Sequence, residues 1–154
     1  VGPELSKRKI PFHVFVSPAK ALSKDQRYLS PVELVELASI SGATIGAHGN
    51  THIPLTTLSD IRMLQEIKES KHSLEQILQT SIHTMSYPFG MVNDDVRAAT
   101  EKTGFTQVAC SKWGFVTPST DRLMQPRVDI WRGDSKRAYL QKLAGNWNWF
   151  SRIT

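Results

Sequence analysis

The stretch ATIGAHGNTH at residues 43–52 joins a short β-rich run to two histidines, His48 and His52. Residues four positions apart share one face of a helix, but glycines flank His48 and a proline follows shortly after His52. Glycine and proline interrupt helices and mark turns. The stretch therefore predicts a buried strand at 43–47 whose C-terminal end carries a histidine-bearing loop.

Strand and helix patterns alternate along the chain, and no linker, repeat or low-complexity stretch divides them. Apolar β-rich runs predict the strands, and capping residues followed by apolar residues at near-3.6 spacing predict the helices. We expect strands at 12–16, 43–47, 84–87, 107–110 and 124–130, and helices capped by Ser30, Ser59, Asn93 and Ser135. The alternation favours one α/β domain over residues 1–154, with right-handed crossovers around a parallel sheet that is open or rolled into a barrel.

Two features predict the buried core. The helix after Ser59 carries a stripe of apolar residues at near-helical spacing, formed by Ile61, Leu64, Ile67, Leu74, Ile77 and Leu78. The single cysteine, Cys110, has no partner for an internal disulfide and lies in an apolar strand pattern. We expect the stripe to face the core and Cys110 to be an inert buried thiol.

The composition narrows the class of protein. The 154 residues include 19 Lys and Arg against 14 Asp and Glu, which gives a net charge of +5 spread along the chain. Diffuse charge of this size does not predict a nucleic-acid partner. No run of about 18 apolar residues predicts a transmembrane segment. The length suits one globular domain but is short for a closed α/β barrel, which typically takes about 250 residues.

His48 and His52 are candidate metal ligands. Neutral imidazole is a common ligand for zinc and similar divalent ions. A catalytic zinc usually has three protein ligands, so a third, expected to be a carboxylate, must come from elsewhere. The alternative is a pair of loop histidines that hydrogen-bond the backbone. Ligands gather at the C-terminal ends of parallel strands, and both the histidine loop and the segment 87–90 follow such ends.

Several segments together resemble the polysaccharide deacetylases of the NodB-homology type, carbohydrate esterase family 4. IPFHVFV at 10–16 resembles the family's IPATFFV strand, and IGAHGNTH at 45–52 is similar to its metal motif H[ST]xxH. SYPFGMVN at 86–93 is close to the YPFG form of its third motif, and the resemblance covers roughly residues 5–129. It implies a distorted (β/α) barrel that is incomplete at its N-terminus.

The resemblance also implies an activity and roles for particular residues. Family members hydrolyse N-acetyl, or sometimes O-acetyl, groups on polymeric or lipid-linked sugars with a divalent metal, usually zinc. The metal would be held by His48, His52 and an aspartate. Phe89 stands where the family has a Tyr whose backbone N–H stabilises the oxyanion, and Tyr87 and Pro88 would shape the groove wall. An acetylated carbohydrate would be the partner, at the bacterial cell envelope or in the cytoplasm.

Arg127 lies in PRVD at 126–129, which resembles a late segment of YPFG-type members. It could orient the base carboxylate or a sugar oxygen, or it could form a simple surface ion pair. The aromatic segment WNWF at 147–150 leaves two alternatives as well. These rings could stack on sugars, or they could dock a helix onto the core.

The chain departs from the family pattern in two places. The family's first motif, TFDD or similar, supplies the catalytic base and the metal aspartate from a strand before IPATFFV, but only nine residues precede Ile10 here. The late histidine that serves as general acid is also missing, since no histidine follows His83. We expect the chain to be a fragment of a longer enzyme. The alternative is a degenerate, noncatalytic glycan-binding or scaffold protein with the same fold.

Overall fold

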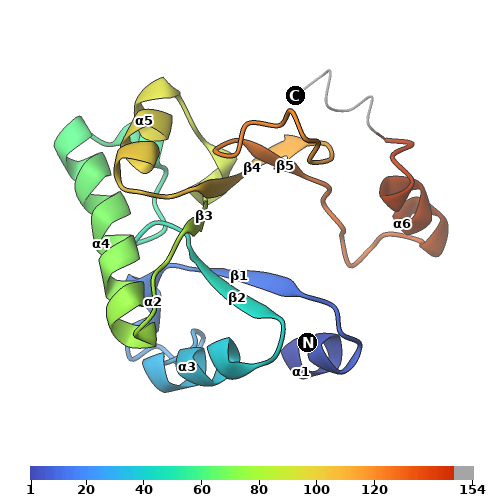
Figure 1. The fold of residues 1–154 in the computed structure, drawn as a ribbon, viewed down its shortest axis with the longest axis horizontal. Helices are drawn as coiled ribbons and strands as arrows, with labels where there is room; N and C mark the ends of the chain where they lie inside the picture. Colours follow the sequence, from blue (N-terminus) through green and yellow to red (C-terminus); the bar gives the residue numbers. More distant parts are fainter. Residues whose placement is uncertain (148–154) are drawn as a thin grey trace.

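The structure of the protein is a computed structural model that describes residues 1–147. Its centre is a parallel sheet with the strand order β1-β2-β3-β4-β5, which Figure 1 shows from one side. The strands are β1 (Phe12–Val16), β2 (Ala43–Ala47), β3 (Thr84–Ser86), β4 (Gln107–Trp113) and β5 (Gln125–Arg127). The α-helices are α1 (Gly2–Lys7), α2 (Pro18–Ala21), α3 (Pro31–Ser39), α4 (Asp60–Leu78), α5 (Asp94–Lys102) and α6 (Lys136–Leu143). Two short 3₁₀ turns, η1 (Leu55–Thr57) and η2 (Pro88–Gly90), complete the described elements.

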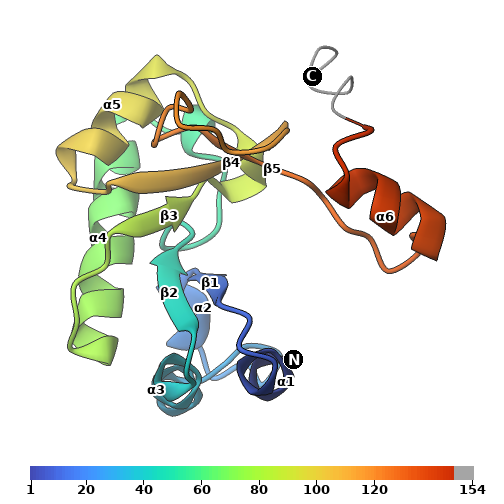
Figure 2. The ribbon, with the colours of Figure 1, turned by 45° about the vertical axis from the view of Figure 1, so that its right-hand side comes forward.

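The strand order confirms the predicted parallel sheet. Each strand pairs in parallel with the strand that precedes it in the chain, so every crossover runs in the same sense around the sheet. Right-handed crossovers of this kind place their helices on one face. Figures 1 and 2 show α3, α4 and α5 gathered on one side of the strands, with α6 apart from them beyond β5. This sequential order is that of a sheet rolled toward a barrel.

The two faces of the sheet differ in chemistry because side chains alternate along each strand. One face packs on the helices and forms a single apolar cluster, which includes Ile45, Ala47, Met85, Val108 and Cys110 from the strands with Leu34, Met63, Ile67 and Val96 from the helices. The intervening strand positions are mostly polar and include His13, Thr44, Thr84, Ser86 and Ser111. The buried position of Cys110 confirms the expected core thiol.

Most of the predicted apolar stripe of helix α4 faces the core, since Ile67 and Leu74 belong to the core cluster and Ile77 and Leu78 pack against it. Met63, Ile67 and Leu74 are buried as part of the core, whereas Ile61 is 82% exposed. Six residues separate Ile61 from Ile67, which rotates their side chains roughly 120° apart around the helix. Ile61 therefore points away from the sheet, and the prediction for this residue was wrong. Glu66 is buried on the core side instead.

Strands β3, β4 and β5 end or begin at different residues from those predicted, which were 84–87, 107–110 and 124–130. The helix caps were also predicted only in part. The capping box of α3 is present as expected, since the Ser30 side chain accepts from the Glu33 N–H and the Glu33 carboxylate accepts from the Ser30 N–H. Ser59 is the N-cap of α4 but makes no side-chain capping hydrogen bond. The short helices α1 and α2 had not been predicted. Among the described residues, no helix combines the length and apolarity needed to cross a membrane.

Helix α6 is tied to the end of β4 through Lys142. The Lys142 ammonium is 4% exposed and donates to both Asp134 carboxylate oxygens, at 2.8 and 2.9 Å, and to the Asp129 carbonyl at 3.0 Å. It also lies over the rings of Trp113 and Trp147. Trp147 is half-buried in this contact, which favours the docking interpretation for this residue. The rest of the aromatic segment, at 148–150, lies outside the described residues.

Gly46 permits the close approach of the first three strands. A Cβ at this position would lie 2.7 Å from the Phe15 ring and 2.6 Å from the Thr84 hydroxyl oxygen. Contacts this short require a neighbour to shift, and the two neighbours, Phe15 and Thr84, lie on the strands that pair with β2 on either side. We predict that Gly46→Ala lowers the free energy of unfolding by about 1–3 kcal/mol through overpacking. Urea unfolding followed by circular dichroism would measure the difference.

The matched control is Gly133→Ala, because a Cβ there would meet no atom within 4 Å. It should leave the urea midpoint close to that of the wild type. Equal midpoints for the two variants would contradict the packing argument at Gly46.

Candidate active site

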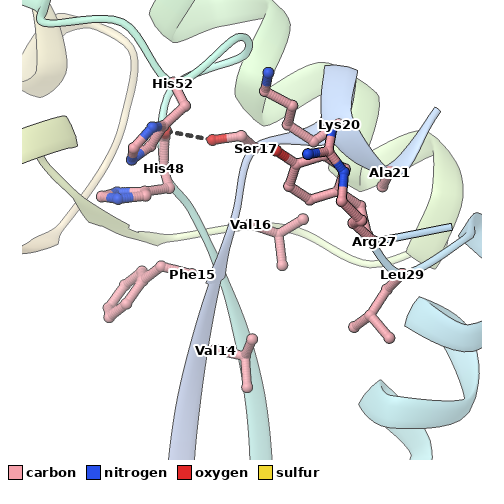
Figure 3. A pocket seen from close by; sticks show the side chains of 11 residues that line it. Val14, Phe15, Val16, Ser17, Lys20, Ala21, Arg27, Leu29, His48 and His52 are labelled. Carbon is pink, nitrogen blue, oxygen red and sulfur yellow. Dashed lines mark hydrogen bonds between the residues drawn. The ribbon is translucent and has the colours of Figure 1, made fainter. Parts of the chain in front are cut away.

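The histidine loop begins directly at the end of β2, as predicted. The backbone N–H of His48 donates to the Val16 carbonyl at 2.9 Å, which continues the β1–β2 pairing. The Ser17 hydroxyl donates to the His48 carbonyl at 2.7 Å, and Figure 3 shows this bond with the His48 and His52 rings beside it. These bonds fix the His48 backbone and therefore the direction in which its side chain leaves the sheet.

The His48 ring is held by the neighbouring strand. Its Nδ1 lies 2.7 Å from the Ser86 carbonyl oxygen. Since a carbonyl can only accept, we assign the proton to Nδ1, which leaves the lone pair of Nε2 free to bind a ligand. Burial lowers the pKa of His48, the Ser86 carbonyl partly offsets this, and the charges of His52 and Arg127 lower it further. The neutral imidazole that a metal requires is thus favoured.

His52 adopts an unusual backbone conformation. Its φ is 65°, in the left-handed region, which costs a non-glycine residue about 1–3 kcal/mol and persists only where the surroundings enforce it. The His52 ring lies between those of His48 and Phe89, with centroid distances of 4.8 and 4.7 Å. The two imidazoles are therefore close enough to share one small ligand.

Two hollows meet at the histidines. A cavity of about 520 Å³ lies on the polar side of the sheet and is lined by His13, Phe15, Ser86, Tyr87, Phe89, Ser111 and Arg127 together with His48 and His52. A second, of about 440 Å³, lies toward α2 and includes Lys20, Arg27 and Tyr28 in its lining (Figure 3). Both histidines border both hollows, so a ligand bound by them would be accessible from either side.

Phe89 occupies the turn after β3 and lines the first cavity. Its φ is 57° and its ψ is 7°, and its side chain is 60% exposed. The Gly90 N–H donates to the Tyr87 carbonyl at 3.0 Å and the Met91 N–H to the Pro88 carbonyl at 3.2 Å. Within residues 1–147, no acceptor is found for the Phe89 N–H. The residue that carries this N–H lines the cavity.

Tyr87 and Pro88, which we had expected to shape a groove wall, are fully buried. The Tyr87 hydroxyl donates to the Leu123 carbonyl at 3.0 Å, and burial raises the pKa of Tyr87 to about 12. Their side chains thus support the turn from beneath, and Tyr87 contributes to the lining of the first cavity. The exposed ring at this turn belongs to Phe89 instead.

Arg127 lies where β5 borders the same cavity. Its Nε donates to the Cys110 carbonyl at 3.0 Å. None of the ion pairs found among residues 1–147 includes Arg127, so the alternative of a simple surface ion pair is not observed there. Its guanidinium remains available to an anionic or hydroxyl group in the cavity.

The two histidines fit a divalent metal as two of its protein ligands. His48 presents a free Nε2 and His52 lies beside it. Among the described residues, no third His, Cys, Asp or Glu side chain joins them in a metal-binding group. The donor set is therefore suited to zinc in kind, and another ligand is needed to complete a catalytic site.

Two residues near the site were missed in the sequence. His13 is exposed and lines the cavity that His48 also borders. The register could have indicated this, because His13 and Phe15 alternate with core positions and pair with Thr44 and Gly46. Glu66 lies on α4, and its carboxylate accepts hydrogen bonds from Thr51 in the histidine loop. The available signal in the sequence was the charge of Glu66 next to the apolar residues of the α4 stripe, which could have indicated a buried carboxylate with a specific partner.

Comparison with known proteins agrees with this geometry. The family model described as polysaccharide deacetylase matches residues 2–108, which is more than half of the chain. The chain therefore belongs to the polysaccharide deacetylase family.

Individual relatives are more distant. The chain is 31% identical over 64 residues to a poly-β-1,6-N-acetyl-D-glucosamine N-deacetylase of Staphylococcus epidermidis. The matched segment covers 42% of this chain and 22% of that protein. It is 30% identical over 82 residues to chitin deacetylase 1 of Cryptococcus neoformans. This matched segment covers 53% of this chain and 17% of that protein. Across the curated relatives it matches, the chain spans between 17% and 40% of their length.

The fold also matches solved structures. The Streptococcus pyogenes deacetylase PplD, solved in complex with acetate, superposes with a TM-score of 0.84 at 20% identity. The match covers 92% of this chain and 62% of that one. At this level of identity the likeness establishes the fold, which is the NodB-type α/β architecture expected from the sequence.

The burial of Tyr87 leads to a prediction about alkaline stability. In the unfolded chain the phenol ionises near pH 10, whereas in the folded protein it stays protonated up to about pH 12. The folded state therefore holds more protons in that interval, and stability falls as the pH rises through it. We predict that the wild type loses up to about 2–3 kcal/mol more than Tyr87→Phe between pH 10 and pH 12.

The comparison requires urea unfolding of both proteins at pH 7, 10 and 12. At pH 7 the variant should be about 1 kcal/mol less stable, because it loses the hydrogen bond to Leu123. Parallel loss of stability in both proteins above pH 10 would show that Tyr87 is not the group responsible.

Proposed function

We propose that this protein hydrolyses acetyl groups, mainly N-acetyl groups, on a poly- or oligosaccharide, and that His48 and His52 are two protein ligands of a divalent metal, with zinc the first choice. The observation that carries this proposal is the hydrogen bond from His48 Nδ1 to the Ser86 carbonyl. It leaves Nε2 free to bind a ligand, and His48 lines a cavity together with His52, Phe89 and Arg127. A pair of histidines that only hydrogen-bond the backbone would also account for this bond, but it would not require the His52 ring to lie 4.8 Å from that of His48.

The chemistry requires an electrophile stronger than a free amide. A divalent metal at the histidines would polarise the acetyl oxygen and lower the pKa of the attacking water. The Phe89 N–H would donate to the developing oxyanion, a role that depends on the backbone and tolerates Phe in place of Tyr. Phe89 lines the same cavity as His48 and His52, which supports this assignment.

Arg127 is proposed to orient an anionic group in the same cavity. The bond from Nε to the Cys110 carbonyl fixes one edge of the guanidinium, which leaves the remaining N–H groups as donors. A carboxylate acting as base, or a sugar oxygen, would suit these donors. The proposed reaction also needs a carboxylate base and a third metal ligand, and among the described residues no third His, Cys, Asp or Glu joins the two histidines.

The substrate is proposed to be a polymer of N-acetylated amino sugars. Two relatives are named for action on chitin and on poly-β-1,6-N-acetyl-D-glucosamine. The Phe89 ring is 60% exposed at the rim of the cavity, where an aromatic face could pack on a pyranose ring. The two hollows that meet at the histidines would let a chain extend on both sides of the reacting acetyl group.

A noncatalytic glycan-binding protein is the second candidate. It is favoured by one observation, namely that no third ligand joins His48 and His52 among the described residues. The two candidates differ in metal affinity and in acetate release, so the experiments below separate them.

The metal site is tested by calorimetric titration of zinc into the wild type and two variants. With two imidazole ligands, we expect weak binding that His48→Ala and His52→Ala each abolish. His72→Ala is the matched control, because His72 is exposed on α4, away from the cavity. Zinc binding that survives both histidine substitutions would contradict the proposed ligands.

Activity is tested by acetate release from N-acetylated chitooligosaccharides with the complete gene product. We expect His48→Ala to lower the rate by at least about 100-fold, since the ligand it removes is needed in every turnover. Phe89→Tyr should stay within about threefold of the wild type because it keeps the backbone donor. Sugar binding without acetate release by the wild type would favour the noncatalytic candidate.

A further inference from the structure

Glu66 is a buried carboxyl group that the proposed chemistry does not use. It lies in the middle of α4 on the core-facing side, with an exposed fraction of 8%. Its neighbours on that side, Met63 and Ile67, are apolar and belong to the core. Burying a carboxylate is costly unless it is hydrogen-bonded, so its partners are informative.

Both partners of Glu66 belong to Thr51, in the histidine loop. The Oε1 atom accepts from the Thr51 N–H at 2.5 Å and from the Thr51 hydroxyl at 2.8 Å. One turn further along α4, Glu69 Oε2 accepts from the Asn50 side-chain amide at 3.0 Å. The Glu66 bonds are partly buried and reach the loop backbone, whereas the Glu69 bond is exposed and reaches only the side chain of Asn50.

The contact acts on the residue next to the strained one. Thr51 directly precedes His52, whose backbone is in the left-handed region. On the other side, a Cβ at Gly49 would lie 3.1 Å from the Pro88 ring and 3.6 Å from Glu66 Oε1. The loop is therefore enclosed between α4 and the turn that carries Phe89. Such surroundings are what an unfavourable backbone conformation requires.

We infer that Glu66 is a positioning residue, which holds the loop so that His52 stays beside His48 before any ligand binds. The two hydrogen bonds to Thr51 fix the backbone immediately before His52, and the ring contact with Phe89 then fixes the imidazole. The metal part of this inference rests on the proposed function, whereas the ordering of the loop does not depend on it.

The variants separate position from charge. Glu66→Asp keeps the charge but is one methylene too short to reach both Thr51 donors. Glu66→Gln keeps the length and an oxygen acceptor but removes the charge. Thr51→Val removes the hydroxyl donor while it preserves side-chain size and the N–H bond. Glu69→Gln is the matched control, because it makes the same charge change on the same helix at the exposed contact with Asn50.

The first readout is hydrogen exchange of the Thr51 amide in the metal-free protein, measured by NMR. We expect Glu66→Asp to speed exchange at least about tenfold relative to the wild type, since the amide loses its acceptor and the loop opens more often. Glu66→Gln should lie much closer to the wild type, and Glu69→Gln should match it. Wild-type protection in Glu66→Asp would overturn the inference.

The second readout is zinc affinity of the same proteins at a temperature well below their unfolding midpoints. Loss of a group that orients a metal ligand typically weakens binding about 10–100-fold, and we expect at least about tenfold for Glu66→Asp and a smaller loss for Thr51→Val. If Glu66→Gln weakened binding more than Glu66→Asp, charge and not position would be responsible, and the inference would fail.

The two readouts keep this inference apart from the proposed function. A wild type that binds no zinc would count against the proposed metal site, while exchange at Thr51 would still decide whether Glu66 orders the loop. If Glu66→Asp failed to fold, Thr51→Val would replace it. Unchanged zinc affinity in a folded Thr51→Val, together with unchanged protection of its amide, would overturn the inference.

Discussion

The backbone bond from the His48 N–H to the Val16 carbonyl is the contact on which the site depends. It extends the pairing of β1 and β2 by one residue beyond β2 and so defines the level at which the chain leaves the sheet. From that level, the His48 side chain reaches the Ser86 carbonyl on β3. A shift of one residue in this register would turn the imidazole to the opposite face of the sheet.

The same register explains why the sheet can be apolar on one face and polar on the other. Helices α3, α4 and α5 cover the first face, where Ile45 and Met85 join the core. The second face borders the cavity in which His13 and Ser86 meet the histidine loop. Parallel strands buried on both faces are usually apolar throughout. Here the polar positions lie on the face that borders the cavity. The alternation of side chains along the strands therefore supplies both the apolar core face and the polar lining of the site.

The sequence predicted those features that local patterns determine. The five strands and the caps of α3, α5 and α6 follow from runs of apolar residues and from Ser30, Asn93 and Ser135, which act within a few residues of themselves. The histidine loop was predicted because glycine and proline act locally as well. Helices α1 and α2 have six and four residues, too few for a hydrophobic period to be recognised.

The features that the sequence did not predict depend on distant partners. Tyr87 faces inward because its hydroxyl reaches Leu123, 36 positions later. An aromatic residue before proline gives no indication of that direction. Glu66 is buried because Thr51, in another element, supplies its donors. Ile61 follows the helical period only approximately, and the packing of α4 on the sheet decides which side is covered.

The sequential strand order has a consequence for biosynthesis. Every strand pairs with the strand that the ribosome has just completed, so the sheet can grow by accretion, one helix and one strand at a time. Domains generally fold as they emerge, starting from the N-terminal side. His48 would leave the ribosome with the second strand but gain its Ser86 partner only with the third. The nascent site would therefore mature stepwise, with the imidazole oriented after the loop that carries it has been made.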